Sequence, residues 1–361
     1  MNPIYVDISA ESRRYPVYIE EGLTAHLGEL VDAAHLGSRQ FIVSSPLVWR
    51  LHGREIGRAL RSAEPILVPD GERFKQLSTV SRIHEALIRA QADRGTGIVA
   101  VGGGVIGDMA GFAAATYLRG VGLAHVPTTL LAQVDSAIGG KVGVNHPLGK
   151  NLIGAFHQPA LVAVDPLLLG TLPRREFRAG LYEVIKYGMT SSRGLFERLD
   201  RDVSAVFARE PSVLVPLISE ACAIKAAVVS LDEREAGPRR VLNFGHTAGH
   251  AIEAVTKYRR FRHGEAIAYG ILVAAEVAAA RGVLAGADHQ ALSRMIVQLG
   301  PLPPVNDLSV REVLEVARRD KKVVDGKLHF VLATAIGAWT VVDDVTEKEL
   351  ARGLKKVGLK P

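Results

Sequence analysis

The amino-acid sequence predicts a doubly wound α/β domain followed by a mainly helical domain. The chain has 361 residues, more than a single hydrophobic core usually organises. Its first half alternates short β-branched runs with helical patterns, as in a parallel sheet covered by helices. From about residue 172 onward, apolar residues recur every three or four positions, as in long amphipathic helices. We therefore expect an α/β domain over residues 1–172 and a helical domain over residues 173–361.

The N-terminal domain should contain an opening hairpin and a series of parallel strands. The hairpin is expected over residues 4–8 and 15–19, and the parallel strands over residues 41–43, 66–68, 98–101, 123–126 and 161–164. Helical patterns occupy residues 49–61 and 80–92. Strands that alternate with helices indicate βαβ units and hence a parallel sheet.

The C-terminal domain should consist mainly of helices. They are expected over residues 177–189, 213–231, 245–255 and 266–280, with a late strand pair at 328–332 and 339–342. The most apolar stretch, residues 270–280, contains Glu276 and is expected to be a buried helix. Because ligand sites often lie where two domains meet, we expect the active site in a cleft between them.

The amino-acid composition is that of a globular protein and argues against membrane-spanning and disulfide-rich secreted proteins. Hydrophobic residues make up 48% and charged residues 23% of the chain, within the globular range. No uninterrupted apolar run reaches the ~18 residues needed to cross a bilayer, and the first residues do not resemble a secretion signal. We therefore expect a cytoplasmic protein without a membrane partner. The single cysteine, Cys222, excludes an internal disulfide and is expected to be an inert core thiol.

The net charge of +6 points to anionic partners. Basic residues cluster at 239–240, 259–262 and 318–322, which one could read as a nucleic-acid surface. No zinc-knuckle spacing, RNA-binding aromatic motif or long basic run supports that interpretation. A small phosphorylated substrate explains a few converging cations equally well, so we expect no nucleic-acid partner.

A glycine-rich turn follows the strand expected at residues 98–101. Its sequence is Gly102-Gly103-Gly104-Val105-Ile106-Gly107-Asp108, and a helical pattern follows. Strand, glycine turn and helix form the setting in which backbone N–H groups bind a pyrophosphate. The alternative is a tight turn that only packs a helix on its strand. The acidic residue of the usual dinucleotide fingerprint is missing about 20 positions on, and Asp135 comes late. A better candidate for a ribose is the acidic segment 69–75, which contains Asp70, Glu72 and Lys75.

Two histidines are spaced for metal binding. His246 and His250 lie at i and i+4 on an expected helix, His263 follows in the next segment, and Glu183 offers a carboxylate. The zinc-protease motif would require Glu at position 247, where this chain has Thr, so a metallopeptidase would lack its general base. A structural role for each histidine is the alternative.

Two lysines lie in a glycine-rich apolar stretch. Lys141 follows Gly139-Gly140, and Lys150 precedes Asn151. Burying a lysine without an anion is costly, so this stretch is a candidate phosphate or carboxylate site. A solvated surface loop is the alternative, but the apolar segments 130–134 and 152–156 on either side argue against it.

These runs resemble 3-dehydroquinate synthases over essentially the whole chain. The matching stretches are residues 69–75, 102–111, 126–136, 139–156, 177–188, 242–253, 263–265 and 320–322. The resemblance implies a Rossmann-like NAD-binding α/β domain and a helical domain that binds a metal and the substrate. It also implies a homodimer, with NAD and a zinc or cobalt ion as cofactors.

The resemblance also assigns roles to residues. It implies Glu183, His246 and His263 as metal ligands. It implies NAD contacts by Asp70, Glu72, Lys75, Gly103, Gly104, Val105, Asp108, Thr128, Thr129, Asp135, Lys141, Lys150, Thr171, Leu172 and Glu176. The substrate and its phosphate would meet Asp135, Lys141, Lys150, Asn151, Lys186, Lys225, Arg239, Asn243 and His250, with Arg119 reaching across a dimer interface. Two assignments stay open: a substrate lysine at Lys321 or Lys322, and an NAD contact near Ser44 and Ser45.

The implied reaction converts 3-deoxy-D-arabino-heptulosonate 7-phosphate to 3-dehydroquinate and phosphate. It combines transient oxidation by NAD, phosphate elimination, reduction, ring opening and an intramolecular aldol step. One alternative is a metal-dependent polyol dehydrogenase, which would not need Lys141, Lys150 and Arg239 together. The other alternative is a sister sugar phosphate cyclase with another sugar phosphate as substrate.

Overall fold

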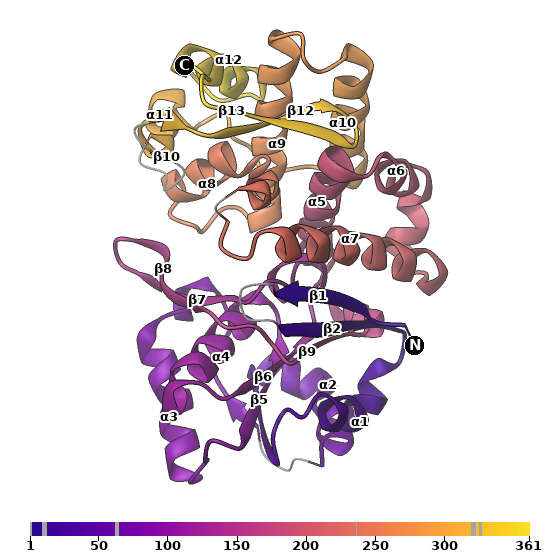
Figure 1. Ribbon diagram of the computed structural model, residues 1–361. Coiled ribbons are helices and arrows are strands. Elements are labelled where there is room, and N and C mark those ends of the chain that lie inside the picture. Colours follow the sequence, from indigo (N-terminus) through magenta and orange to yellow (C-terminus); the bar gives the residue numbers. More distant parts are fainter. Residues whose placement is uncertain (1, 9–12, 62–64, 236, 319–322, 325–326) are drawn as a thin grey trace. The chain divides into compact units, whose positions relative to one another are not determined.

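Figure 1 shows the computed structural model, which describes residues 2–8, 13–61, 65–235, 237–318, 323–324 and 327–361. The chain forms two compact units. The N-terminal unit combines Met1–Pro173 with Arg209–Arg234, and the C-terminal unit combines Arg174–Ala208 with Glu235–Pro361. The first division lies beside the expected boundary at 172/173. Segment 209–234, which we placed in the helical domain, groups with the N-terminal unit instead.

The N-terminal unit is built on a seven-stranded sheet with the order β1-β2-β9-β6-β5-β3-β4. β1 (Ile4–Ile8) and β2 (Arg13–Ile19) pair antiparallel, as expected for the opening hairpin. The other neighbours pair parallel: β3 (Arg39–Ser44), β4 (Ile66–Leu67), β5 (Thr96–Gly102), β6 (Gly122–Pro127) and β9 (Leu161–Val164). The predicted α/β fold class is confirmed.

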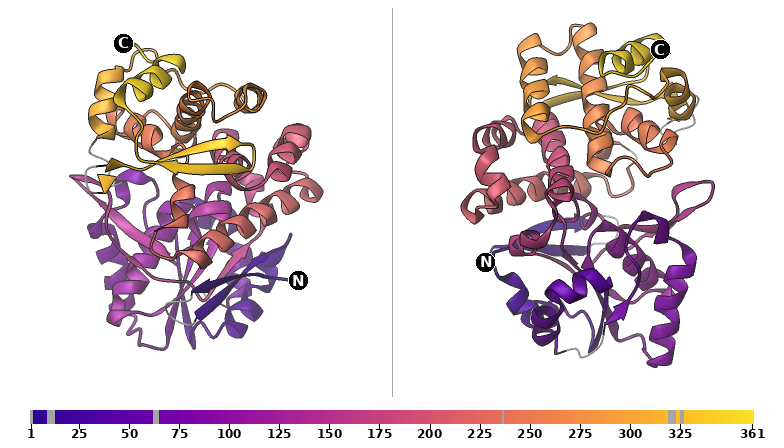
Figure 2. Two further views of the ribbon diagram at one scale, coloured as in Figure 1. Left: turned by 45° about the horizontal axis from the view of Figure 1, so that its top comes forward. Right: turned by 180° about the vertical axis from the view of Figure 1, so that it is seen from behind.

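Helices cover both faces of this sheet. α3 (Leu77–Arg89) and α4 (Gly104–Thr116) lie on one face, and α1 (Leu27–Ala33) and α2 (Pro46–Ala59) lie on the other (Figure 1, Figure 2). β5 shows why: Ile98 and Ala100 join the core beneath α3 and α4, whereas Val99 and Val101 join the core beneath α1 and α2. Successive side chains of a strand point to opposite faces, so a strand buried on both sides is apolar throughout.

The carboxyl ends of the parallel strands carry most of the predicted nucleotide residues. Segment 69–75 follows β4, the glycine turn follows β5, and Thr128 and Thr129 follow β6. β4 and β5 lie on opposite sides of β3, so the strand order reverses there. Ligands of open α/β sheets bind outside the carboxyl ends at such a reversal. The topology therefore gathers these segments at one edge.

Two elements of the N-terminal unit differ from the expectation. The glycine- and lysine-rich stretch, for which no secondary structure was predicted from the sequence, is an antiparallel hairpin of β7 (Lys141–His146) and β8 (Gly149–Phe156). The helix α7 (Pro211–Leu231) packs against β1 and buries Leu214, Leu217 and Ile218. This apolar packing explains why segment 209–234 groups with the N-terminal unit.

α7 is also the one helix of the described residues that is long and apolar enough to cross a membrane by length and composition. An 18-residue stretch of it has a mean hydropathy of 1.8, although Glu220 and Lys225 interrupt the apolar sequence, as expected from the absence of an uninterrupted apolar run of that length. A single such helix is weak evidence, since core helices of soluble proteins pass the same test. Cys222 on this helix is fully buried, and its thiol donates to the Gln133 carbonyl at 3.3 Å. α7 therefore has the features of a core helix.

The C-terminal unit is mainly helical. Its helices are α5 (Arg174–Ser191), α6 (Arg193–Ala208), α8 (His246–Val255), α9 (His263–Ala280), α10 (Gly286–Leu299), α11 (Val310–Ala317) and α12 (Glu347–Lys356), with the strand pair β12 (Phe330–Ala335) and β13 (Ala338–Val342). The short strands β10 (Val323–Val324) and β11 (Lys327–Leu328) also pair. The predicted helices and late strand pair are confirmed within a few residues.

The helices α8 and α9 approach closely because they meet at glycines. A Cβ on Gly270 would overlap the carbonyl of Gly245, and a Cβ on Gly249 would lie 2.9 Å from the Ile267 side chain. Glycine is therefore required where the two backbones cross. This contact fixes the two helices that carry the predicted metal-binding histidines.

Candidate metal and nucleotide sites

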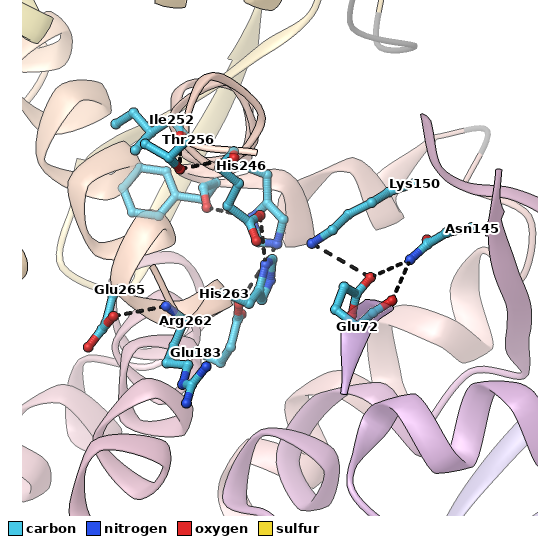
Figure 3. Close-up of polar contacts among 12 residues, drawn as sticks. Glu72, Asn145, Lys150, Glu183, His246, Ile252, Thr256, Arg262, His263 and Glu265 are labelled. Carbon is cyan, nitrogen blue, oxygen red and sulfur yellow. Dashed lines mark hydrogen bonds and ion pairs between the residues drawn. The ribbon is translucent and has the colours of Figure 1, made fainter. Parts of the chain in front are cut away.

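Three helices of the C-terminal unit bring the predicted metal ligands together. α5 contributes Glu183, α8 contributes His246, and His263 is the first residue of α9 (Figure 3). Glu183 is fully buried, and its Oε1 lies 3.4 Å from Nε2 of His263 and 3.8 Å from Nε2 of His246. His250 belongs to the same cluster, since the ligand atoms of the three histidines lie within 4.8 Å of one another.

The spacing of these atoms fits a divalent metal ion. Two ligands bonded at about 2.1 Å to one ion at a tetrahedral angle lie roughly 3.4 Å apart. The Glu183–His263 and Glu183–His246 distances are close to this value. Nitrogen and carboxylate donors in this combination suit zinc and cobalt. Glu183, His246 and His263 therefore fit the zinc or cobalt ion that the resemblance implied.

The surroundings of the cluster attract positive charge. Burial alone would lower the pKa of His263, but the carboxylates of Glu253 and Glu183 raise it to about 10. Lys186 lies on the same helix as Glu183, and its Nζ is 2.5 Å from Oε2 of that carboxylate. Oε2 therefore forms an ion pair with the lysine, and Oε1 faces the histidines.

Two further predicted substrate residues lie just before α8. Arg239 and Asn243 belong to a 3-10 helix (Pro238–Asn243), and Arg239 is only 1% exposed. The Asn243 amide donates to the Glu235 carboxylate at 2.5 Å. This short helix leads through Gly245 into His246, so the predicted substrate groups and a metal ligand share one continuous segment.

In the N-terminal unit, the glycine turn has the shape of an anion site. Gly103 caps α4, and the Thr128 amide donates to the Gly102 carbonyl at 3.0 Å. A Cβ on Gly103 would lie 3.1 Å from Cγ2 of Thr129, and one on Gly104 would lie 2.8 Å from Oγ of Ser136. Only glycine leaves the backbone N–H groups at this helix terminus accessible to a pyrophosphate.

Lys75 is the centre of a polar network beside this turn. It is 5% exposed, forms an ion pair with Asp108 of α4, and donates to Oδ1 of Asn151 at 2.6 Å. Burial alone would lower the pKa of Lys75, but the carboxylates of Asp108 and Glu72 raise it. Glu72 in turn lies 3.7 Å from Nζ of Lys150. The network gathers predicted NAD and substrate residues from three separate segments.

The comparisons with known proteins agree with this geometry. The model of the 3-dehydroquinate synthase N-terminal domain matches residues 65–179, and that of the C-terminal domain matches residues 180–323. A 3-dehydroquinate synthase of Pelotomaculum thermopropionicum is 44% identical over 350 residues, which cover 96% of this chain and 94% of that protein. This chain belongs to the 3-dehydroquinate synthase family.

Two solved structures place the family within a wider group. A 2-epi-5-epi-valiolone synthase from Streptomyces hygroscopicus, with NAD+ and Zn2+ bound, has a TM-score of 0.87 and 28% identity, and the match covers 95% of this chain and 96% of that one. A 2-deoxy-scyllo-inosose synthase with carbaglucose-6-phosphate, NAD+ and Co2+ has a TM-score of 0.87, 26% identity and coverage of 98% and 99%.

A polyol dehydrogenase was one of our alternatives. A probable glycerol dehydrogenase from Sinorhizobium meliloti has a TM-score of 0.67 and 17% identity, and the match covers 95% of this chain and 96% of that one. That likeness shows a shared fold alone. The family assignment therefore favours a synthase over a dehydrogenase.

Several further residues expected from the resemblance to 3-dehydroquinate synthases have the following surroundings within their own units. Lys141 begins β7 and is exposed. Asp70 is exposed and accepts from the Gly71 amide at 2.6 Å. Thr171 contacts His52 at 2.9 Å, and Leu172 accepts from Arg209. Glu176 pairs with Arg262 at 2.5 Å within the C-terminal unit. Lys321 and Lys322 lie outside the described residues.

Several polar residues around the family site were not predicted from the sequence. Glu253 lies 3.2 Å from the His263 ring, Glu235 bonds Asn243, and the Asn145 amide donates to Glu72 at 2.8 Å. Glu253 lies three residues after His250, so helical spacing could have placed it on the same face. Glu235 and Asn145 carry no comparable signal, because their partners depend on how the chain folds.

Proposed function

We propose that this chain catalyses the conversion of 3-deoxy-D-arabino-heptulosonate 7-phosphate to 3-dehydroquinate and phosphate, and so acts as a phosphorus–oxygen lyase. Family membership supports the reaction. The observation that carries the chemistry is Oε1 of the buried Glu183 facing Nε2 of both His246 and His263. Three protein ligands leave coordination positions for substrate hydroxyls, as Lewis-acid catalysis requires.

Each cofactor has a candidate place in the described residues. NAD would lie on Gly103 and Gly104, with segment 69–75, Thr128 and Thr129 beside it. A zinc or cobalt ion would lie on Glu183, His246 and His263. When bound, NAD supplies reversible hydride transfer and the metal ion polarises a hydroxyl group. Both groups are present in the related synthases with 26–28% identity.

The chain's own cations would bind and orient the substrate. Lys225, Arg239 and Lys186 are each at most 6% exposed. Lys186 pairs with Glu183 and Lys225 with Asp135 within the chain, and a substrate carboxylate or phosphate would bring a further anion to these cations. Orientation matters because the elimination and the aldol step act on the same small molecule at different carbons. His250, beside the metal ligands, would hold or transfer a proton of the substrate.

We further propose that the enzyme is a cytoplasmic homodimer. The position of Arg119 supports the dimer. It follows α4, whose 13 residues span about 20 Å, while the glycine turn lies at the other end of that helix. Arg119 is exposed, and the resemblance implies that it reaches the substrate phosphate of a second copy.

The proposal is tested by incubating the protein with the heptulosonate phosphate, NAD and zinc. We expect release of inorganic phosphate together with a stoichiometric amount of the carbocyclic product. Glucose 6-phosphate and glycerol serve as alternative substrates, which a sister cyclase or a polyol dehydrogenase would use. Turnover of either one without turnover of the heptulosonate would overturn the proposal.

A further inference from the structure

Glu253 is a buried carboxylate beside the metal-ligand cluster, and it has no role in the site described above. Glu253 is 3% exposed, and its Oε2 lies 3.2 Å from Nδ1 of His263. It lies on α8 at positions i+7 from His246 and i+3 from His250, so one face of this helix presents all three side chains. Nε2 of His263 faces Glu183 on the other side of the ring. The imidazole therefore lies between two buried carboxylates.

The backbone of Glu253 is fixed at the end of its helix. Its carbonyl accepts from the Tyr258 amide at 2.8 Å and from the Thr256 hydroxyl at 3.0 Å. The same hydroxyl also donates to the Ile252 carbonyl at 2.8 Å (Figure 3). These bonds close the last turn of α8, so the carboxylate projects from a rigid support.

The backbone of His263 is fixed independently at the start of α9. Glu265 is fully buried and accepts from the Arg262 amide at 2.9 Å, which caps the helix. Arg175 of α5 donates to both oxygens of Glu265, each at 2.7 Å. Because this clamp fixes the Cα of His263, the remaining freedom is rotation of its side chain. Glu253 faces Nδ1 of the His263 ring, and a hydrogen bond between them fixes the rotation of the ring.

We propose that Glu253 is a positioning residue that orients His263 and sets its tautomer for the metal. The Nδ1–H of His263 donates to the Glu253 carboxylate, which leaves the lone pair of Nε2 directed at the metal position beside Glu183. A carboxylate behind a ligating histidine also increases the basicity of the ring. The inference rests on the proposed metal site and adds a residue that does not touch the ion.

The other proposed histidine ligand, His246, has a neutral partner on its second ring nitrogen. Nδ1 of His246 lies 3.1 Å from the carbonyl of Phe244, a neutral acceptor. The two histidines therefore present the same nitrogen, Nε2, to Glu183 but differ in what supports the opposite nitrogen. His263, supported by a charged group, is the stronger donor of the pair.

The test is zinc affinity without substrate or NAD, measured by competition with a chromophoric chelator. Glu253→Gln keeps the shape and removes the charge, and we expect its zinc dissociation constant to rise about 10- to 100-fold. The visible spectrum of the cobalt-loaded variant should also shift, since ligand strength changes. Glu276→Gln is the matched control: Glu276 of α9 lies 3.0 Å from His289, a carboxylate–histidine pair outside the cluster. Its affinity and spectrum should equal those of the wild type.

An affinity of Glu253→Gln within about twofold of the wild type overturns the inference. If Glu253→Gln does not fold, Glu253→Asp is the test variant. It keeps the charge but shortens the side chain, so it should also weaken zinc binding. An unchanged zinc affinity of Glu253→Asp would then overturn the inference. His263→Ala distinguishes failure of the proposed metal site from failure of the proposed role of Glu253. Zinc retained by His263→Ala refutes the proposed metal site itself. Zinc lost there but retained by Glu253→Gln refutes only the role of Glu253.

Discussion

Lys225 donates to Asp135 at 2.6 Å, although the two residues are 90 positions apart. The side chains are 8% and 20% exposed. Asp135 lies on a single π-helical turn (Ala132–Ser136), which follows the predicted NAD contacts Thr128 and Thr129 after β6. Lys225 lies on α7. The return of α7 to the N-terminal unit is what creates this pair.

Stability should depend on both partners of this pair. Lys225→Met leaves the partly buried Asp135 carboxylate without this cation, and we expect the free energy of unfolding to fall by about 2–4 kcal/mol. Asp135→Asn should cost a similar amount. The double variant should lose clearly less than the sum, whereas its activity should stay as low as in either single variant. Chemical denaturation of all four proteins measures this, and strictly additive losses would show that the pair contributes no coupling.

The two histidines of α8 should behave differently toward zinc. His246→Ala should lose tightly bound zinc together with activity, because its Nε2 faces Glu183. His250→Ala should keep close to one zinc per chain while activity falls sharply, since a fourth protein ligand would close a tetrahedral site. Elemental analysis after dialysis measures both. Zinc lost from the His250 variant would mean that His250 is a ligand.

Lys141 offers a test of anion binding that is separate from folding. Its side chain is exposed, so Lys141→Ala should leave thermal unfolding unchanged. Activity should fall at least about tenfold, because a charge-assisted hydrogen bond contributes roughly 1.5–3 kcal/mol. Lys348→Ala, at an exposed position on α12, is the matched control and should keep full activity. Equal kinetics for the two variants would make Lys141 an ordinary surface lysine.

His125 on β6 should make stability depend on pH. Burial, with a smaller contribution from His157, lowers the pKa of His125 from 6.5 to about 4. Between pH 6.5 and 4 the unfolded chain binds a proton that the folded chain does not, so stability falls as the pH falls. The loss approaches about 3 kcal/mol. His125→Gln should flatten the decline across this window, with His26→Gln at an exposed position as the control. Parallel declines in all three proteins would contradict this origin.

The cofactor should cycle within one turnover. If NAD both accepts and returns the hydride, substoichiometric NAD should support many turnovers, and NADH absorbance should not accumulate. Phosphate release and absorbance can be followed in the same sample. One NADH formed per product would instead indicate a net oxidation, as in a dehydrogenase.

Much of the fold could be predicted from local sequence. Strands such as β5 are apolar throughout because both faces are covered, and helices such as α9 repeat apolar residues at helical spacing. The glycine turn was visible because close backbone approach admits only glycine. The β7–β8 hairpin was not predicted, since its glycines and lysines resemble a loop until Gly143 packs against Gly154 across the pair.

The sequence alone predicted the types of residue suited to a metal site and, through its resemblance to a family, proposed Glu183, His246 and His263 as the ligands. It could not decide that Oε2 of Glu183 pairs with Lys186 while Oε1 faces two histidines, nor that Glu253 contacts the opposite nitrogen of one of them. Glu183, Glu253 and His263 come from three different helices, and no local pattern encodes the distance between them. That distance follows from the packing of α5, α8 and α9, where glycines let backbones touch and a buried Glu265 is held by Arg175. Spacing along one helix is a local property, whereas the arrangement of a site across helices is set by tertiary packing.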